Sequence, residues 1–430
     1  MERNLAIKKN LIIITLYFLC FSFNVFSLET KSDTKDLYKN IRPAIFRVHV
    51  IDSYTRKKVS AGSAFQIDTN GIIVTNYHVI ADAIKDPDIY QIKYIAHDKS
   101  EGEAKILSID IINDLALLKH DNKQHNAFIP LNKAPLLKGT EIYSLGNLHD
   151  KGIIIVKGLY NGFIEKSWYS KMLFSGALNP GMSGGPSINE DGEVIGINVS
   201  TQGNDISFIV PVSFLTKLLI KAENNPFHKT NDWNSIIENQ LKNNITKIIN
   251  NITKAKWETV EFGDSKVPGE VVKSFTSWGK TKEISEKKHK YQHLYVGSDE
   301  SIYISSDIYT GNIYFRYFWI TGNKNLNPFQ FYALCEHYYE PYQFNNISQN
   351  EAKNFVSYVD FLQLDNKPCK VTLSFRPYKN FKTIYDVGIR IASLHKKDQM
   401  LIADLNVMGI TKKDTFKLLE KFLKSIKWKS

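Results

Sequence analysis

The chain has 430 residues, of which 43% are hydrophobic and 23% charged, so wholesale disorder is excluded. After residue 28 no apolar run reaches the roughly 20 residues of a membrane-spanning helix, so the body of the chain is not a membrane bundle. The formal net charge of +11 is uneven: residues 28–215 hold 20 basic and 21 acidic residues, whereas residues 216–430 hold 32 basic and 22 acidic. We therefore expect a domain boundary near residue 216.

The N-terminus has the pattern of a signal peptide. The basic segment Met1–Asn10 precedes the uncharged segment Leu11–Phe26, and cleavage after Ser27 fits this arrangement. We expect export to the periplasm or the medium, with a membrane anchor as the alternative if the signal stays uncleaved. Of the three cysteines, Cys335 and Cys369 would then remain, either as one disulfide or as two buried thiols.

Residues 28–217 are predicted to form one domain of short strands. Turn sequences at Asp68–Gly71 and Asn189–Gly192 lie between strand-like segments, so each predicts a hairpin. Only Val79–Ile84 has helical spacing. Many short strands at this spacing indicate a sandwich or barrels. The predicted strands include residues 45–50, 63–67, 72–75, 89–95, 115–119, 141–145, 152–156 and 194–199.

Three short motifs in this stretch contain candidate catalytic residues. His78 follows an apolar strand, and Asp114 precedes the buried strand Leu115–Lys119. Ser183 lies in the glycine-rich turn Asn179–Pro186. A serine hydroxyl needs a base within hydrogen-bond reach, and the base needs a third group that fixes its tautomer. We predict that His78 takes the proton of Ser183 and that Asp114 holds the other ring nitrogen.

The glycines around the serine have a chemical reason of their own. The N–H groups of Gly181 and Ser183 are predicted to bind the oxyanion of a tetrahedral intermediate, since glycine permits the tight turn this requires. Asp110 is the alternative acid. We prefer Asp114 because the following strand would bury it, whereas Asp110 lies in an alternating stretch that points it outward.

These motifs resemble the trypsin-like serine proteases of the HtrA/Deg type over about residues 37–220. The resemblance implies a double β-barrel with the active site in the cleft between the barrels. His78 and Asp114 would come from the first barrel and Ser183 from the second. It also implies a serine endopeptidase that cleaves protein or peptide substrates through an acyl-enzyme. The matching segments are residues 75–80, 113–119, 144–147, 177–186, 192–198 and 207–212.

The chain departs from the family pattern in two ways, and its substrate pocket is open to a separate prediction. Met182 precedes the serine where the family usually has asparagine, so the resemblance does not determine the resting conformation of the loop. Residues 216–430 have no Gly-Leu-Gly-Phe-like loop, so a PDZ domain is not expected. Ala177 stands six residues before the serine, where a trypsin-like pocket would have aspartate, which favours an apolar P1 residue.

The C-terminal half is predicted to be a helical connector, residues 218–256, followed by an α+β domain of unknown role, residues 257–430. The whole chain is thus expected to be mainly β. A terminal helix over Lys412–Lys429 would pack an apolar stripe made of Phe416, Leu419, Leu423 and Ile426. Its lysines form a solvated basic face or a contact for an anionic surface or membrane. The predicted strands include residues 258–262, 271–277, 293–296, 301–305, 312–320, 330–335, 355–364, 370–375, 384–395 and 401–407.

Other partners are expected to be few. Export argues against nucleic acid, and we predict no cofactor. His289 and His293 are four residues apart, but they flank lysines at a turn-to-strand boundary, so no metal is expected there. The alternative function is a non-catalytic peptide-binding protein on a protease scaffold, with the C-terminal domain as the main binding module. The sequence leaves the oligomeric state open.

Overall fold

A computed structural model describes residues 33–429, apart from residues 149, 202–205, 225–231, 285–288, 299 and 340–343. By its internal contacts the chain divides into two compact units, residues 1–40 and 41–430. The expected signal peptide of residues 1–27 lies outside the described residues, and the first unit contains most of helix α2 (Thr34–Ile41). Of the helices in the described part of the chain, none combines the length and the apolar character needed to cross a membrane.

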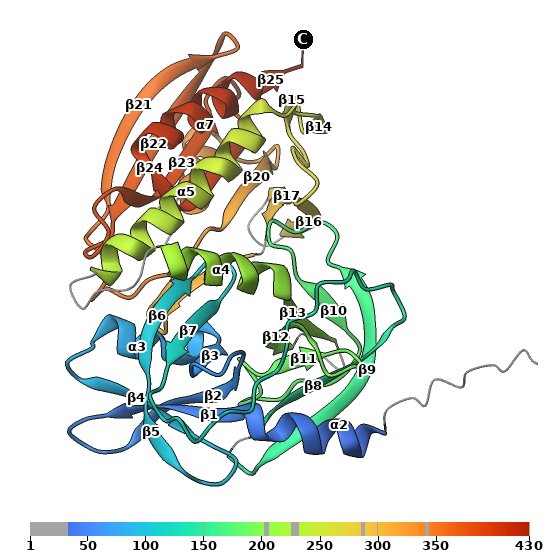
Figure 1. Cartoon of the computed structure of the whole chain (residues 1–430). Coiled ribbons are helices and arrows are strands. Elements are labelled where there is room, and N and C mark those ends of the chain that lie inside the picture. Colours follow the sequence, from blue (N-terminus) through green and yellow to red (C-terminus); the bar gives the residue numbers. More distant parts are fainter. Residues whose placement is uncertain are drawn as a thin grey trace, which may run out of the picture. The chain divides into compact units, whose positions relative to one another are not determined.

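The first sheet of the second unit has seven antiparallel strands in the order β5-β4-β1-β2-β3-β7-β6 (Figure 1). The predicted hairpin joins β2 to β3, where the Asp68 carboxylate accepts hydrogen bonds from the N–H of Asn70 (3.1 Å) and Ile72 (2.9 Å). Gly71 supplies the positive φ of 83° in this turn. The elements are η1 (Arg42–Ala44), β1 (Ile45–Asp52), β2 (Lys58–Gln66), β3 (Ile72–Thr75), α3 (Tyr77–Lys85), β4 (Tyr90–Ile95), β5 (Glu101–Glu103), β6 (Lys105–Asp110) and β7 (Leu115–Lys119).

The second sheet closes into a barrel in the order β10-β13-β12-β11-β8-β9. The predicted hairpin at Asn189–Gly192 joins β11 to β12, with Gly192 at a φ of 78°. Of the two expected barrels, this second one closes, and the first sheet keeps an open strand order. The elements are β8 (Glu141–Asn147), β9 (Ile153–Phe163), β10 (Met172–Phe174), β11 (Pro186–Ile188), β12 (Val194–Thr201), β13 (Ser207–Pro211) and helix α4 (Val212–Asn224).

The C-terminal region is built on another seven-stranded antiparallel sheet, in the order β16-β17-β20-β24-β23-β22-β21. Its strands are β16 (Thr276–Ile284), β17 (His289–Ser298), β20 (Ile313–Gly322), β21 (Val356–Leu364), β22 (Lys367–Pro377), β23 (Ile384–Ser393) and β24 (Gln399–Thr411). Two small sheets accompany it, made by β14 (Thr259–Phe262), β15 (Ser265–Pro268) and β25 (Lys427–Trp428), and by β18 (Ile302–Ser305) and β19 (Ile308–Thr310).

Helices cover both faces of this sheet. Helices α5 (Trp233–Lys254) and α7 (Lys412–Ser425) lie side by side on one face, where they share a hydrophobic cluster with the strands (Figure 1). Helix α6 (Pro328–Tyr339) packs on the other face. The chain is therefore mainly β, with an α+β region after the second barrel, as the sequence predicts.

Two predicted strands are wrong. Of residues 271–277, only Thr276 and Ser277 belong to a strand, β16, and the residues before them form a turn. Residues 330–335 belong to helix α6, in which Phe331 and Cys335, one turn apart, are both buried against the sheet. The sequence feature that indicates this helix is the capping pattern at its N-terminus. Asn327 accepts a hydrogen bond from the N–H of Gln330 (2.9 Å), and the Gln330 side chain accepts one from the N–H of Asn327 (3.1 Å). This reciprocal cap, with Pro328 at the first helical position, marks a helix start.

The terminal helix is shorter than predicted: it ends at Ser425, and Lys427–Trp428 form strand β25. Of the predicted stripe, Ile426 is buried, Leu419 and Leu423 are partly buried against the cluster, and Phe416 is half exposed. Leu418 and Phe422 are buried as well. The basic face is also partly used inside the molecule, because the Lys421 ammonium donates to the carbonyl of Thr253 at 2.6 Å. Charged lysine side chains in this region therefore help to fix α7 on α5.

The two remaining cysteines are free thiols. Cys335 lies in the cluster under α6, whereas Cys369 lies in the cluster under α5 and α7. Burial raises the pKa of both thiols to about 12. Of the two alternatives left by the sequence, the structure has the pair of buried thiols.

The C-terminal region shares a hydrophobic cluster with the first sheet. Ile304 and Ile308 of the β18–β19 hairpin belong to the same cluster as Ile80 and Ile84 of α3. The buried Tyr77 hydroxyl donates to the carbonyl of Ile304 at 2.8 Å. The helix that carries His78 is thus packed between the first sheet and the C-terminal region.

A buried carboxylate, Asp386, stabilises the far end of the C-terminal sheet. It is fully buried and accepts hydrogen bonds from Arg376 (2.6 Å) and from the Tyr378 hydroxyl (2.6 Å). Burial raises its pKa, although the nearby Arg376 charge acts in the opposite direction. Replacing Asp386 with asparagine should lower the free energy of unfolding by about 3–5 kcal/mol, because Arg376 would lose its buried counter-charge.

Urea unfolding followed by tryptophan fluorescence measures this loss. The control is Asp365→Asn, which removes the partly exposed ion pair with Lys427 and should cost less than about 1 kcal/mol. Equal losses in the two variants would contradict the assignment of Asp386 as the buried anchor.

Candidate active site

His78 is the second residue of α3, directly after β3. The segment before it is fixed by the backbone carbonyl of Asp114, which accepts hydrogen bonds from the Asn76 side chain (2.8 Å) and from the N–H of Tyr77 (3.3 Å). The start of α3 is therefore tied to the turn that carries the predicted acid.

Asp114 lies in the turn between β6 and β7, in the left-handed conformation with a φ of 56°. Its two carboxylate oxygens bind one residue. Oδ1 accepts from the backbone N–H of His78 (2.9 Å), and Oδ2 lies 2.6 Å from His78 Nδ1. This double contact fixes both the position of the histidine and the ring nitrogen that faces the acid.

The alternative acid, Asp110, has a different role. Its carboxylate accepts from the N–H groups of Ile112 and Asn113 (both 3.1 Å) and from the Asn113 side chain (2.6 Å). Asp110 thus closes the turn in which Asp114 stands, and Asp114 is the carboxylate beside the histidine.

The surroundings of His78 favour its protonated form. Its side chain is 30% exposed and that of Asp114 is 20% exposed. Burial by itself lowers the pKa of His78, but the charge and the hydrogen bond of Asp114 outweigh burial and raise the pKa above its ordinary 6.5. An imidazolium formed at this position is therefore stabilised.

Ser183 lies in the turn between β10 and β11. Gly181 and Gly184 have φ values of 94° and 84°, which only glycine adopts readily. The Met182 side chain is fully buried in the hydrophobic cluster of the closed barrel, so it fixes the turn to the core of that barrel. In the part of the chain that the structure describes, the N–H groups of Gly181 and Ser183 make no backbone hydrogen bond.

The serine hydroxyl has its own partner in this structure. Ser183 Oγ donates to the carbonyl of Val199 at 2.9 Å. The structure thus joins His78 to Asp114, while no hydrogen bond between His78 and Ser183 occurs among the residues described. Strand β2 lies between the helix that carries His78 and the turn that carries Ser183. A Cβ on its Gly62 would lie 2.6 Å from Val79 Cγ2 and 3.0 Å from the carbonyl oxygen of Ser183.

Comparisons with known proteins agree on one family. A model of the trypsin-like peptidase domain matches residues 62–197. The mitochondrial serine protease HTRA2 of Bos taurus is 26% identical over 220 residues, which cover 48% of this chain and 46% of its own. A probable periplasmic serine endoprotease, DegP-like, of Rickettsia conorii is 34% identical over 163 residues, covering 34% of this chain and 29% of its own. Residues 62–197 form a trypsin-like domain of the HtrA/Deg type.

We call residues 41–220 the HtrA-type domain. A solved structure of the serine endoprotease from Yersinia pestis also matches, with 26% identity and a TM-score of 0.39 over 44% of this chain and 66% of that chain. The chain spans less than half the length of the two curated relatives named above.

Ser63 of the HtrA-type domain was missed by the sequence reasoning. It is fully buried in β2, where its hydroxyl donates to the carbonyl of Gly181 (2.7 Å) and accepts from the N–H of Asn147 (2.7 Å). Its own N–H donates to the carbonyl of Ser183 (2.8 Å). One residue of the first sheet therefore holds the serine turn of the closed barrel at two points.

The C-terminal region adds an aromatic side chain beside the histidine. The ring of Tyr303, from β18, stands edge-on to the His78 imidazole, with 6.2 Å between the ring centroids. Burial raises the pKa of Tyr303 to about 12, so the phenol is neutral near pH 7. Nothing in the sequence marks this contact, because the two residues are far apart in the chain.

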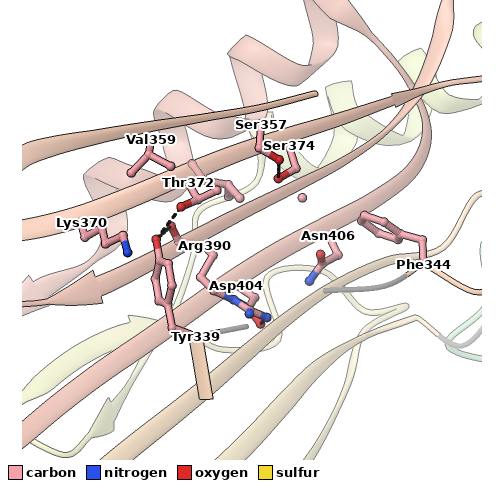
Figure 2. A pocket seen from close by; sticks show the side chains of 12 residues that line it. Tyr339, Phe344, Ser357, Val359, Lys370, Thr372, Ser374, Arg390, Asp404 and Asn406 are labelled. Carbon is pink, nitrogen blue, oxygen red and sulfur yellow. Dashed lines mark hydrogen bonds and ion pairs between the residues drawn. The ribbon is translucent and has the colours of Figure 1, made fainter. Parts of the chain in front are cut away.

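A separate cavity of about 300 Å³ lies on the face of the C-terminal sheet opposite α5 and α7 (Figure 2). It holds none of the predicted catalytic residues. Its floor carries the buried ion pair between Arg390 and Asp404 (2.6 Å) and the buried Asn406, and Tyr339 lies at its side.

The described residues hold no group of three or more histidine, cysteine, aspartate or glutamate side chains suited to a metal ion. The two spaced histidines both lie on β17. His289 Nε2 lies 2.6 Å from the Tyr338 hydroxyl, and His293 stacks on Phe318 with 4.6 Å between the centroids.

Proposed function

We propose that the protein is an exported serine endopeptidase that cleaves protein substrates with Ser183, His78 and Asp114. The observation that carries the proposal is the double contact of the Asp114 carboxylate with His78, next to a glycine-rich turn that presents a serine. The relationship to serine proteases of the HtrA/Deg type supports the same reaction.

The reaction begins with a change of rotamer at Ser183. Rotation about χ1 takes Oγ from the carbonyl of Val199 toward the Nε2 side of His78. His78 removes the hydroxyl proton while Oγ attacks the scissile carbonyl, and Asp114 stabilises the imidazolium. The N–H groups of Gly181 and Ser183 bind the oxyanion.

The remaining steps restore the enzyme. The imidazolium gives its proton to the leaving amine, which leaves an acyl group on Ser183 Oγ. His78 then takes a proton from water, the hydroxide adds to the acyl carbonyl, and the proton returns to Oγ as the acid product departs. The proton balance closes without a cofactor.

We further propose an apolar P1 residue and action outside the cytoplasm. Ala177 is half-buried and uncharged, so it offers no counter-charge to a basic P1 side chain. The relative from Rickettsia conorii is described as periplasmic, which supports export.

Ser63→Ala should lower kcat for peptide hydrolysis by about 10–100-fold with little change in KM, because the oxyanion turn would lose one of its two anchors. Ser63 is a positioning residue, so Ser63→Thr, which keeps the hydroxyl, should recover part of the lost kcat. Steady-state kinetics on a fluorogenic peptide measures both values. A rise in KM with unchanged kcat would contradict the positioning role.

The test of the function is digestion of unfolded casein and of an apolar-P1 peptide series by the mature chain. We expect cleavage after apolar residues, with acyl-enzyme trapped at Ser183 by a slow ester substrate and detected by mass. A folded mature chain that cleaves neither casein nor any peptide, and that binds casein fragments unchanged, would point to the non-catalytic alternative.

A further inference from the structure

Strand β21 forms one edge of the C-terminal sheet. It pairs with β22 alone, so one side of its backbone faces no other strand in the described ranges. The N–H of Phe361 is on that open side, where it donates to its own neighbour, Asp360 Oδ1, at 2.8 Å. Because pairing alternates along an antiparallel strand, the N–H and C=O groups of Ser357 and Val359 share this open side.

The strand is also strongly apolar on both of its faces. Val359 and Ser357 stand on the same face as Thr372 and Ser374 (Figure 2), and the even-numbered side chains point to the face that carries α5 and α7. Large exposed side chains lie along the strand and just before it: Phe355 (37%), Val356 (49%), Tyr358 (64%), Val359 (57%), Phe361 (67%) and Leu362 (37%).

The opposite edge of the same sheet is built differently. Strand β16 is exposed as well, but Lys280, Lys282 and Glu283 interrupt it. Charges on an edge strand, lysines above all, prevent it from pairing with other chains. In β21 the only charge is Asp360. The protection found on one edge is therefore missing from the other.

We propose that β21 pairs antiparallel with β21 of a second copy of this chain, about a two-fold axis at Val359. The unpaired backbone N–H and C=O groups of an edge strand are satisfied by another extended strand. With the two-fold axis at Val359, the side chains of two β21 strands complement each other. Val359 then faces its own copy, and Val356 faces Leu362 twice. Asp360 lies opposite Tyr358, so the two carboxylates of the dimer do not face each other.

The exposed apolar area of the strand approaches what a dimer needs. At about 150–250 Å² for each large side chain, the exposed fractions amount to roughly 1,000 Å² of apolar surface over the two copies, of which edge pairing covers a part. The paired backbone and the flanking residues add to this area, and the low end of stable interfaces is about 1,200 Å². The pairing would join the two C-terminal sheets into one continuous sheet and hold two HtrA-type domains in one particle.

The experiment is sedimentation equilibrium of the mature chain over a dilution series. The wild type should be a dimer that dissociates on dilution. Val359→Lys, which places two ammonium groups at the axis, should be monomeric throughout with an unchanged circular dichroism spectrum. Trp278→Lys, at a comparably exposed position on the β16 edge, should leave the dimer intact. A wild type that stays monomeric, or a Val359→Lys variant that dimerises like the wild type, overturns the proposal.

A cross-linking measurement tests the register. Val359→Cys should form a disulfide between two copies under mild oxidation, because facing residues at such a position lie about 5.5 Å apart at Cα. Leu362→Cys should not, since its own copy lies several residues along the strand. The thiols of Cys335 and Cys369 are buried, so they do not compete with the introduced cysteine. A disulfide at Leu362→Cys but not at Val359→Cys would exclude this register.

Discussion

Replacing Ser183 with alanine should lower kcat for peptide hydrolysis by about 10⁵–10⁶-fold, the range seen when a nucleophile that acts with a base is removed. The physical reason is that Ser183 carries the only hydroxyl of the glycine-rich turn Asn179–Pro186, where the N–H groups of Gly181 and Ser183 are available to the oxyanion. The residual rate would come from substrate binding and the oxyanion donors alone. Single-turnover kinetics with excess enzyme measures the loss.

The control for this variant is Ser277→Ala, which removes a hydroxyl from β16, outside the HtrA-type domain. It should hydrolyse the peptide at the wild-type rate. If Ser183→Ala kept more than about a hundredth of the activity, a group other than Ser183 would have to be the nucleophile.

Replacing Asp114 with asparagine should lower kcat by about 10⁴-fold near neutral pH, because the histidine would lose its tautomer control and its counter-charge. The pH dependence gives a second readout. His78 must be neutral to accept the serine proton, and Asp114 raises its pKa, so wild-type kcat/KM should rise with pH through a value above 6.5. Without that charge, burial lowers the pKa, and the acid limb of the variant should move to lower pH.

Asp110→Asn is the matched control, since Asp110 ends β6 directly before the same turn but contacts the backbone of residues 112 and 113. It should change kcat by no more than a few-fold and leave the acid limb in place. A profile that shifts in Asp110→Asn and not in Asp114→Asn would reverse the assignment of the acid.

The sequence predicts the features that local motifs encode. The hairpins at Asp68–Gly71 and Asn189–Gly192 follow from turn residues that favour positive φ, and both occur in the structure. The adjacency of His78 and Asp114 could be predicted because the chemistry of a catalytic base requires an acid, although no single motif contains both. Helix α6 could also have been predicted from the cap formed by Asn327 and Gln330. The aromatic residues that follow favour a strand, and the prediction rests on them.

Other features depend on tertiary packing and have no local signal. Ser63 looks like an ordinary strand serine, and only the approach of the two sheets makes it the anchor of the Ser183 turn. Tyr303 reaches His78 because the β18–β19 hairpin packs on α3. The apolar pattern of β21 predicts a strand, but its edge position, and hence its exposure, is a property of the sheet order.

Covalent labelling with a fluorophosphonate probe tests whether Ser183 is a nucleophile that His78 activates. The folded mature chain should be labelled at one position, which peptide mapping should identify as Ser183. His78→Ala should lose the labelling while keeping the melting temperature of a folded protein. Labelling that is absent from the folded wild type, or that persists undiminished in His78→Ala, would show that Ser183 is not a nucleophile activated by His78.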